Sequence, residues 1–267
     1  MAKPKKNTQA WAVTYADMVT LLLTFFVLLL VILSEAERQV DYQITKLLDK
    51  AHKQMEAALT EESIDVERVT KGVKVTIRGK LFKQLSPDIE PKYNKVIGQI
   101  GELIKQTDIM SIDFFSAGLD SSHEYFGLVN ELRNRGQELA IEIRCEGHTD
   151  DAPIPMDMRT EYESNWQLSS DRSLNVVNLM RQYASMPEKY FSALGYGPHR
   201  PLISVPTIRS KKNKREKDKL REYNRRVEIY LDAFARDKIQ TDEQELINRL
   251  TGKKKSKNVE VSIEQPS

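Results

Sequence analysis

One carboxylate, Asp17, lies in an apolar run that carries no other charge from Trp11 to Leu33. A charged group at the centre of a membrane costs about 2–3 kcal/mol, so such a residue is expected to face protein or water. A carboxylate in this setting can load and release a cation, which is the chemistry that an ion-driven machine needs. The alternative is a residue near the interface whose carboxylate only reaches the water among the lipid headgroups.

A second group of polar residues, which includes Thr149, Asp150, Asn165 and Arg172, lies in four ordered blocks of the C-terminal half. No block places a nucleophile beside a base, and there is no phosphate-binding loop, so we expect no enzyme and no cofactor. His148 is expected to be a structural hydrogen-bonding residue rather than a metal ligand, because no second His or Cys has ligand spacing. The blocks are Glu146-Gly-His-Thr-Asp-Asp151, Asn165-Trp-Gln-Leu-Ser-Ser-Asp-Arg172, Gly195-Tyr-Gly-Pro-His-Arg-Pro201 and Asn224-Arg-Arg-Val-Glu-Ile229.

The apolar run is long enough to cross a membrane. At about 1.5 Å per residue, a helix from Trp11 to Leu33 spans roughly 34 Å, against a hydrocarbon core of about 30 Å. Basic residues precede the run and acidic ones follow it, so the positive-inside rule places the N-terminus in the cytoplasm and the rest outside. A cleaved signal peptide is the alternative, although charges crowd Ser34-Glu35-Ala36 and the run exceeds about 7–15 apolar residues.

Composition limits the remaining possibilities. The chain has 267 residues and a formal net charge of +2, from 41 Lys and Arg against 39 Asp and Glu. This balance excludes a surface that is a nucleic-acid patch throughout, and we expect no nucleic-acid partner. The single cysteine, Cys145, excludes an intrachain disulfide framework and a multi-cysteine metal site.

Beyond the run, strand and helix patterns alternate, which predicts an α+β fold with one sheet packed against helices. Val73–Arg78, Leu139–Glu146 and Val227–Leu231 alternate apolar and polar residues as half-buried strands do. A helix is expected from Pro91. Ser169 or Ser170 is expected to cap a later helix. The buried side of that later helix is expected to carry Leu174, Val177, Met180 and Ala184.

Helical spacing also predicts an amphipathic helix just outside the membrane, from Asp41 to Leu59. Its apolar side is expected to carry Ile44, Leu47, Leu48, Ala51, Met55 and Leu59. Residues 107–135 are left open between an inserted hairpin and an extra helix. The segment Arg209–Arg226 holds ten basic residues against three acids, and a solvated loop or an attraction to an anionic wall polymer is favoured there.

The string Trp11-Ala-Val-Thr-Tyr-Ala-Asp17 resembles the start of the transmembrane segment of MotB-type flagellar stator subunits. The resemblance implies that Asp17 carries the ion, and that a homodimer of these chains pairs with a MotA-like membrane partner that contacts the rotor. It also implies a plug after the span, at about residues 36–51, with a helical linker or a dimer-forming coil as the alternative. No set of sodium ligands is evident, so H+ is favoured over Na+ as the transported cation.

The four polar blocks resemble the OmpA-like peptidoglycan-binding domain over about Gly72–Asp232. The resemblance implies that Asp150 and Arg172 hold the diaminopimelate of the wall peptide, with Asn165 and Thr149 as secondary hydrogen-bonding groups. A zwitterionic amino-acid end needs an anion for its ammonium and a cation for its carboxylate, which an Arg binds bidentately. The alternative is a structural ion pair between Asp150 and Arg172.

The two resemblances together imply a stator subunit of the flagellar motor, in the inner membrane, whose periplasmic domain grips peptidoglycan to support torque. A TolR/ExbD-like energy transducer and a passive wall tether are the alternatives. The expected segments are a cytoplasmic basic tail (1–10), a transmembrane helix (11–33), a plug or linker (34–71), an OmpA-like domain (72–232) and a charged, partly disordered tail (233–267).

Overall fold

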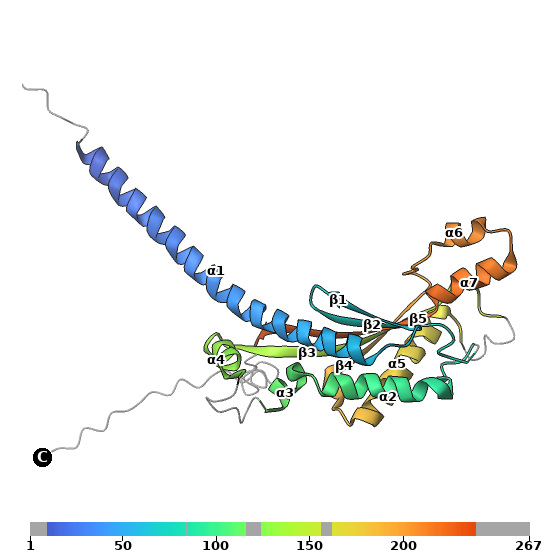
Figure 1. Cartoon of the computed structure of the whole chain (residues 1–267). Coiled ribbons are helices and arrows are strands. Elements are labelled where there is room, and N and C mark those ends of the chain that lie inside the picture. The colour runs from blue at the N-terminus through green and yellow to red at the C-terminus, as the bar shows by residue number, and fades with distance from the viewer. Residues whose placement is uncertain (1–9, 84, 116–123, 156–161, 239–267) are drawn as a thin grey trace, which may run out of the picture. The chain divides into compact units, whose positions relative to one another are not determined.

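A computed structural model of the chain describes residues 10–83, 85–115, 124–155 and 162–238 (Figure 1). The expected basic tail, up to residue 9, and the charged tail beyond residue 238 lie outside these ranges. The elements are α1 (Ala10–Ala58), β1 (Ile64–Val69), β2 (Gly72–Arg78), α2 (Pro91–Lys105), α3 (Asp108–Phe115), α4 (Phe126–Asn134), β3 (Gln137–His148), α5 (Asn165–Ala184), the 3-10 helix η2 (Glu188–Tyr190), β4 (Phe191–Gly197), α6 (Val205–Ser210), α7 (Lys214–Asn224) and β5 (Arg226–Asp237).

Within the described residues, five strands form one mixed sheet in the order β1-β2-β5-β3-β4. β2 pairs antiparallel with both β1 and β5, so that Val75 lies between Val66 and Ile229. β3 and β4 are parallel, with Cys145 opposite Ala193. Parallel neighbours require a crossover, and α5 provides it. The predicted α+β class, with helices packed against one sheet, is confirmed.

Alternation along the strands separates an apolar face of the sheet from a polar one. Val227, Ile229 and Leu231 of β5 are buried in the core, and Glu228 and Tyr230 between them point to the opposite face. β2 and β3 repeat this pattern, which confirms the alternating strands predicted from the sequence. The charged residues of the alternating pattern are therefore collected on one side of the sheet.

α2 and α5 supply the other half of the core. Ile97 of α2 and Val176 of α5 are fully buried in the same cluster as the strand residues. The two helices approach closely because α2 carries Gly101 at the contact, where an added Cβ would lie 3.0 Å from the carbonyl oxygen of Met180. The helix predicted from Pro91 is confirmed, with this proline in its first turn.

The N-cap predicted for α5, Ser169 or Ser170, was wrong. The helix begins at Asn165, and Ser164 is the N-cap residue, whose hydroxyl accepts from the amide of Gln167. Ser169 and Ser170 lie within the helix. Their hydroxyls donate to the carbonyl of Trp166 instead of capping the helix.

The predicted buried side of α5 was wrong at one residue. Leu174 is 48% exposed, whereas Val177, Met180 and Ala184 are buried as expected. The other buried residues of α5 are Leu168, Ser169, Arg172, Ser173 and Val176. Three of these are polar, so a pattern that counts only apolar residues does not include them.

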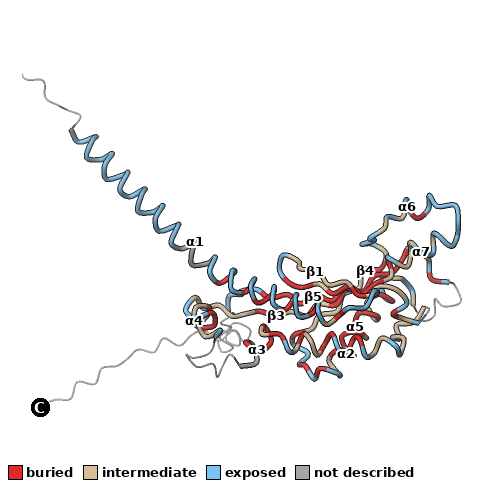
Figure 2. Tube along the Cα trace, in the orientation of Figure 1, coloured by how far each residue is buried: buried red, intermediate tan, exposed pale blue. Residues whose placement is uncertain are grey.

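The N-terminal run and the amphipathic segment form one continuous helix, α1. Trp11–Ile32 is long and apolar enough to cross a membrane by length and composition, and its residues are exposed in Figure 2. The C-terminal part of α1 instead contributes to the core of the domain, through the residues whose spacing predicted an amphipathic helix. They are Ile44, Leu47, Leu48, Ala51, Met55 and Leu59, joined by Val40.

This packing moves the N-terminal limit of the domain. The core begins at Val40 and the sheet begins with β1 at Ile64, whereas the sequence analysis placed the boundary at residue 72. Arg68 of β1 donates to Asp49 of α1 at 2.7 Å, and Lys50 pairs with Asp108 of α3. At the other limit the last strand continues past the expected residue 232, to the end of β5.

The segment left open by the sequence, residues 107–135, holds two further helices, α3 and α4, and residues 116–123 lie outside the described ranges. We call the C-terminal part of α1, from Val40 to Ala58, the stem. Four residues of the new helices are buried in the same core as the stem: Ile109, Met110 and Ile112 of α3 and Leu128 of α4. The extra-helix alternative is therefore confirmed for the described part of this segment, where the two helices add to the core.

Candidate functional site

Residues of three of the four polar blocks meet around one cavity of about 510 Å³, whereas the block from Gly195 to Pro201 contributes no residue to its lining. Its wall combines the loop after β2, the loop after β3, the start of α5 and the end of α7. Thr149, Asp150, Asn165 and Arg172, the four residues expected to form a binding site, all line it. Among the described residues, the titratable side chains in the lining are Lys80, Lys83, Glu90, His148, Asp150, Arg172, Asp218, Arg221, Arg225 and Arg226.

Arg172 is a buried cation with no acidic partner within ion-pair distance in the described part of the chain. It is 7% exposed, its Nε donates to the carbonyl oxygen of Ser86 at 3.1 Å, and its guanidinium lies 4.9 Å from the ring centroid of Phe82. Burial, together with the nearby charge of Arg225, lowers its pKa to about 10, so it stays charged at neutral pH. A buried charge without a counter-ion favours binding of an anion.

Asp150 is held by a different arginine from the one that the sequence analysis paired with it. One carboxylate oxygen accepts from the amide of Ala152 at 2.9 Å, and the other is ion-paired with Arg225. The structural ion pair between Asp150 and Arg172, the alternative weighed from the sequence, is not formed. A carboxylate has capacity for further donors, so Asp150 can still accept from a ligand ammonium.

The two secondary residues differ in what they offer a ligand. Asn165 uses its side-chain amide to donate to the carbonyl of Ala152 at 2.8 Å, which fixes the loop that carries Asp150. Thr149 is 4% exposed, and its hydroxyl has no hydrogen-bond partner among the described residues. A buried hydroxyl in a cavity wall costs free energy until something hydrogen-bonds it, so Thr149 is available to a ligand.

The sequence analysis missed part of the cavity wall. The loop after β2 contributes Phe82 and Lys83, and the carbonyl oxygen of Ser86 orients Arg172. Arg221 of α7 donates to Asp151 at 2.8 Å, which joins the start of the site to the basic segment. The first loop carries no block of the pattern. Asp151, which contacts Arg221, is the last residue of the first polar block, but nothing in that block indicates a role for it.

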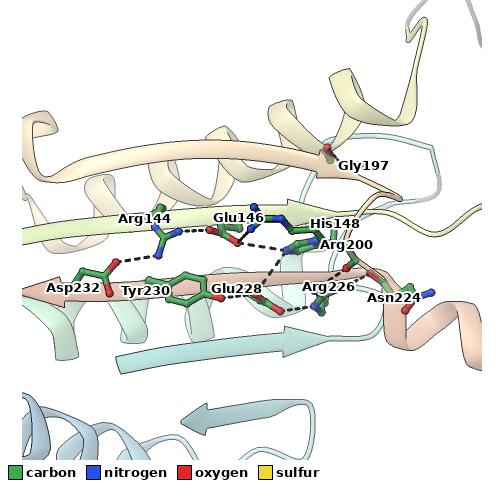
Figure 3. A network of polar contacts seen from close by, with 11 residues as sticks. Arg144, Glu146, His148, Gly197, Arg200, Asn224, Arg226, Glu228, Tyr230 and Asp232 are labelled. Carbon is green, nitrogen blue, oxygen red and sulfur yellow. Dashed lines mark hydrogen bonds and ion pairs between the residues drawn. The ribbon is translucent and has the colours of Figure 1, made fainter. Parts of the chain in front are cut away.

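Beneath the cavity, the polar face of the sheet carries a network of buried charges (Figure 3). Arg144 of β3 pairs with Glu146 and, at 3.0 Å, with Asp232 of β5. Farther along the strands, Arg226 donates to Glu228 at 2.6 Å. β3 and β5 are thus cross-linked by the ion pair between Arg144 and Asp232 as well as by the sheet.

Burial sets the protonation of this network. It raises the pKa of Glu146 and of Asp232, against the opposing effect of Arg144. At Glu228 burial acts in the same sense, but hydrogen bonds from Arg226 and Tyr230 outweigh it and lower the pKa.

His148 lies at the end of β3 between this network and the cavity. It is 3% exposed, and neither ring nitrogen has a hydrogen-bond partner among the described residues, so the predicted structural hydrogen bond is not found there. Its Nε2 is 3.8 Å from a carboxylate oxygen of Glu146 and from one of Glu228, and its ring stacks on Tyr196. Burial, assisted by the charge of Arg226, lowers its pKa to about 4.

Glu146, His148 and Glu228 are the described residues whose ligand atoms lie close enough together to hold a metal ion, within 4.8 Å of one another. Arg144 and Arg226 already neutralise the two carboxylates. A divalent cation would therefore add charge to a buried network whose charges are balanced, which burial disfavours.

Asp17, the residue expected to carry an ion, lies far along the chain from this cavity, in the apolar part of α1. Its main-chain carbonyl accepts from the hydroxyl of Thr20 at 2.8 Å. Thr14 and Thr24 bond to the carbonyls three residues before them in the same way. All three threonine hydroxyls thus bond to main-chain carbonyls of their own helix. Asp17 remains the one carboxylate of the Trp11–Ile32 segment.

Comparisons with known proteins now bear on these two sites. Residues 1–51 match the family model of the MotB plug, described as membrane MotB of the proton-channel complex MotA/MotB. Motility protein B of Bacillus subtilis is 27% identical over 272 residues, which cover 86% of this chain and 96% of the relative. The chain is therefore similar to motility protein B over most of its length. Motility protein B of Helicobacter pylori, strain 26695, is 24% identical over 252 residues, 89% of this chain and 93% of the relative.

The MotB likeness extends over both sites. The family-model match contains Asp17, and the relatives cover most of the chain that forms the cavity. Among solved structures, a MotB-like protein from Desulfovibrio vulgaris is 20% identical, covers 73% of this chain and 94% of its own, and has a TM-score of 0.49. The relatives are named as motility proteins, and this likeness, together with the N-terminal apolar helix, fits a protein of the inner membrane.

The low pKa of His148 gives the stability of the domain a defined pH dependence. As the pH falls from 6.5 towards 4, the unfolded chain takes up a proton that the folded His148 does not, so stability decreases by up to about 3 kcal/mol. His148→Gln should remove this part of the slope. Chemical unfolding followed by circular dichroism at several pH values measures it.

The pH dependence of stability must be compared between the variant and the unmodified chain. Glu146 and Asp232, whose pKa values are raised, make stability increase as the pH falls, which is opposite to the effect of His148. His199→Gln is the matched control, since this histidine is exposed, and it should keep the profile of the unmodified chain. A His148→Gln profile that is parallel to that of the unmodified chain between pH 6.5 and 4 would contradict the assignment.

Proposed function

We propose that this chain is the wall-anchored, ion-conducting stator subunit of a flagellar motor. The span holds one carboxylate, Asp17, and the domain holds a buried cation, Arg172, that lacks a counter-ion among the described residues. The observation that carries the proposal is the presence of both on one chain whose relatives are motility proteins. A stator needs both functions, because torque on a rotor requires an energy source and a fixed support.

The cavity suits the zwitterionic end of a diaminopimelate-containing wall peptide. Arg172 would bind its carboxylate, Asp150 would accept from its ammonium, and the Thr149 hydroxyl would add a hydrogen bond. Asn165 acts on the loop rather than on the ligand, because its amide is already bonded to Ala152. These side chains bind and do not react, so the proposed role is that of an anchor and not of an enzyme.

Arg172→Gln tests the wall site. Removal of a buried charge that would pair with the ligand should weaken binding to purified sacculi by about 30-fold or more. Co-sedimentation of the detergent-solubilised chain with sacculi measures it. Arg181→Gln is the matched control. Arg181 lies on the same helix but does not line the cavity, and its guanidinium is 2.7 Å from the carboxylate of Glu188. Normal sacculus binding by Arg172→Gln would refute the wall site.

In the proposed topology the N-terminus is cytoplasmic and the domain is periplasmic. A single helix cannot enclose an ion path, so two copies of α1 would pair inside a MotA-like partner. When Asp17 gains or loses an ion, its charge changes, and this would change the electrostatic interaction between α1 and the partner. One elementary charge crossing 100 mV releases about 2.3 kcal/mol, enough to bias a conformational equilibrium more than tenfold.

Asp17→Asn tests the ion path. The variant keeps the size of the side chain and removes the charge, so swimming should stop while membrane insertion and sacculus binding persist. Swimming in a strain that lacks its own copy of the subunit measures this. Asp41→Asn is the matched control, because Asp41 is an exposed acid of the same helix outside the apolar run, and it should support normal swimming.

This test also separates the stator from the two alternatives. A passive tether predicts unchanged swimming for Asp17→Asn. An energy transducer of the TolR/ExbD type predicts that loss of the chain leaves swimming intact while another process that depends on the ion gradient fails. The motility relatives favour the stator over both.

We further propose that the transported ion is a proton. A single carboxylate suffices to carry H+, and the threonine hydroxyls near Asp17 donate to their own helix. Swimming should continue when Na+ is replaced by K+ at constant membrane voltage, and it should stop when a protonophore collapses the proton gradient. Swimming that depends on Na+ and survives the protonophore would show a sodium-driven motor.

A further inference from the structure

The helices α6 and α7 form a hairpin whose outer surface is strongly basic. Between Arg209 and Lys219 the chain contains no apolar side chain, and its two acids are Glu216 and Asp218. We call the exposed cations of this segment the hairpin patch. Its members are Arg209, Lys211, Lys212, Lys214, Arg215 and Lys219.

The hairpin is closed at its base and joined to the rest of the domain. Ile208 of α6 is fully buried, and the side-chain amide of Asn224 both donates to and accepts from the main chain of Ile203, each at 2.9 Å. Arg221 of α7 joins the hairpin to Asp151 of the cavity loop. The patch is therefore presented by ordered structure, and the same helix that bears it also lines the cavity through Asp218 and Arg221.

The cations of the patch are unpaired within the described part of the chain, since none of the six makes an ion pair there. Lys214 and Arg215 also occupy the first turn of α7, where the helix dipole disfavours positive charge, and Glu216 is the one acid of that turn. Elsewhere in the domain, Arg144, Arg221 and other arginines are paired with carboxylates. Local electrostatics therefore do not explain the patch, whereas an external polyanion would.

We propose that the hairpin patch binds a phosphodiester-linked anionic polymer of the cell wall, beside the peptide held in the cavity. The proposal rests on the proposed function, because it is the wall ligand that brings such a polymer to the rim. Repeated phosphates suit a row of exposed cations, whose attraction acts over about 10 Å at moderate salt. A membrane surface is disfavoured, because the segment lacks the apolar side chains that surface-binding helices insert.

The test compares intact sacculi, which carry the phosphodiester polymer, with sacculi stripped of it by hydrofluoric acid. The detergent-solubilised full chain should bind the intact preparation about tenfold more tightly at about 50 mM salt, and this preference should largely disappear by about 200 mM. The fourfold variant Lys211→Gln, Lys212→Gln, Lys214→Gln and Arg215→Gln should bind both preparations equally, with the affinity that the unmodified chain has for stripped sacculi.

A matched variant removes the same charge from exposed lysines of α1 and α2 and should keep the preference for intact sacculi. It combines Lys46→Gln, Lys53→Gln, Lys92→Gln and Lys95→Gln. Arg172→Gln separates the two proposals, because it should weaken binding to both preparations and leave the salt-sensitive difference between them. If Arg172→Gln binds both preparations more weakly but still prefers intact sacculi at low salt, the result supports both the wall site and the hairpin patch.

Three results would overturn the inference. If the hairpin variant binds intact sacculi as the unmodified chain does, the patch is only a solvated surface. If it loses affinity equally for intact and stripped sacculi, the patch contacts peptidoglycan carboxylates. If sacculus binding is unchanged while binding to anionic lipid vesicles is lost, the patch faces a membrane.

Discussion

The domain is organised around a buried positive charge, that of Arg172, which makes no ion pair with any described residue. Arg172 stands on α5, and the main-chain oxygens of the loop after β2 and the ring of Phe82 hold its guanidinium in place. Carbonyl oxygens and a ring face orient and shield the guanidinium, but they do not neutralise its charge. Because Asp150 is already engaged by Arg225, the field of this charge is left for a ligand carboxylate.

The sheet makes this arrangement possible by keeping other charges balanced. Its polar face pairs Arg144 with Asp232 and Arg226 with Glu228, so the floor of the cavity is rigid and nearly neutral. His148 stays neutral for the same reason. A further positive charge beside that of Arg226 would be costly in this buried setting. The charge of the site is thus concentrated at its walls, where a ligand can reach it.

The sequence predicts the parts of this domain that depend on periodicity or on local chemistry. Strands such as Val227–Leu231 follow from alternation, and the stem of α1 follows from the spacing between Ile44 and Leu59. What fails depends on contacts between distant segments. Ser169 and Ser170 satisfy the capping rule as well as Ser164 does, and only the packing of the helix start against the cavity loop selects among them.

The partners of the site residues are beyond sequence reasoning for the same reason. Asp150 was matched with Arg172 through the family resemblance, but Arg225, which belongs to the fourth block, is the arginine that pairs with Asp150 in the fold. The loop after β2 carries no distinctive residue type, and it supplies main-chain oxygens, which every residue has. A site built from side chains can be listed from a sequence, whereas the main-chain groups that orient those side chains require the fold.

The continuity of α1 gives the two functional sites a mechanical relation. From Asp17 to Val40, where the helix enters the core, the chain rises by about 35 Å, which is the length of a membrane crossing. The apolar side of the stem is covered by the chain's own domain, so this face is not free to form a coil with a second copy.

Ion pairs at Asp49 and Lys50 hold the stem at the surface of the core, and exposed pairs of this kind are individually weak. The attachment therefore depends on the buried face, and a stem that left the domain would expose Leu47, Leu48 and Met55 to water. Because burial of such side chains stabilises by about 1.5–3 kcal/mol each, release of the stem would need another apolar surface to receive it.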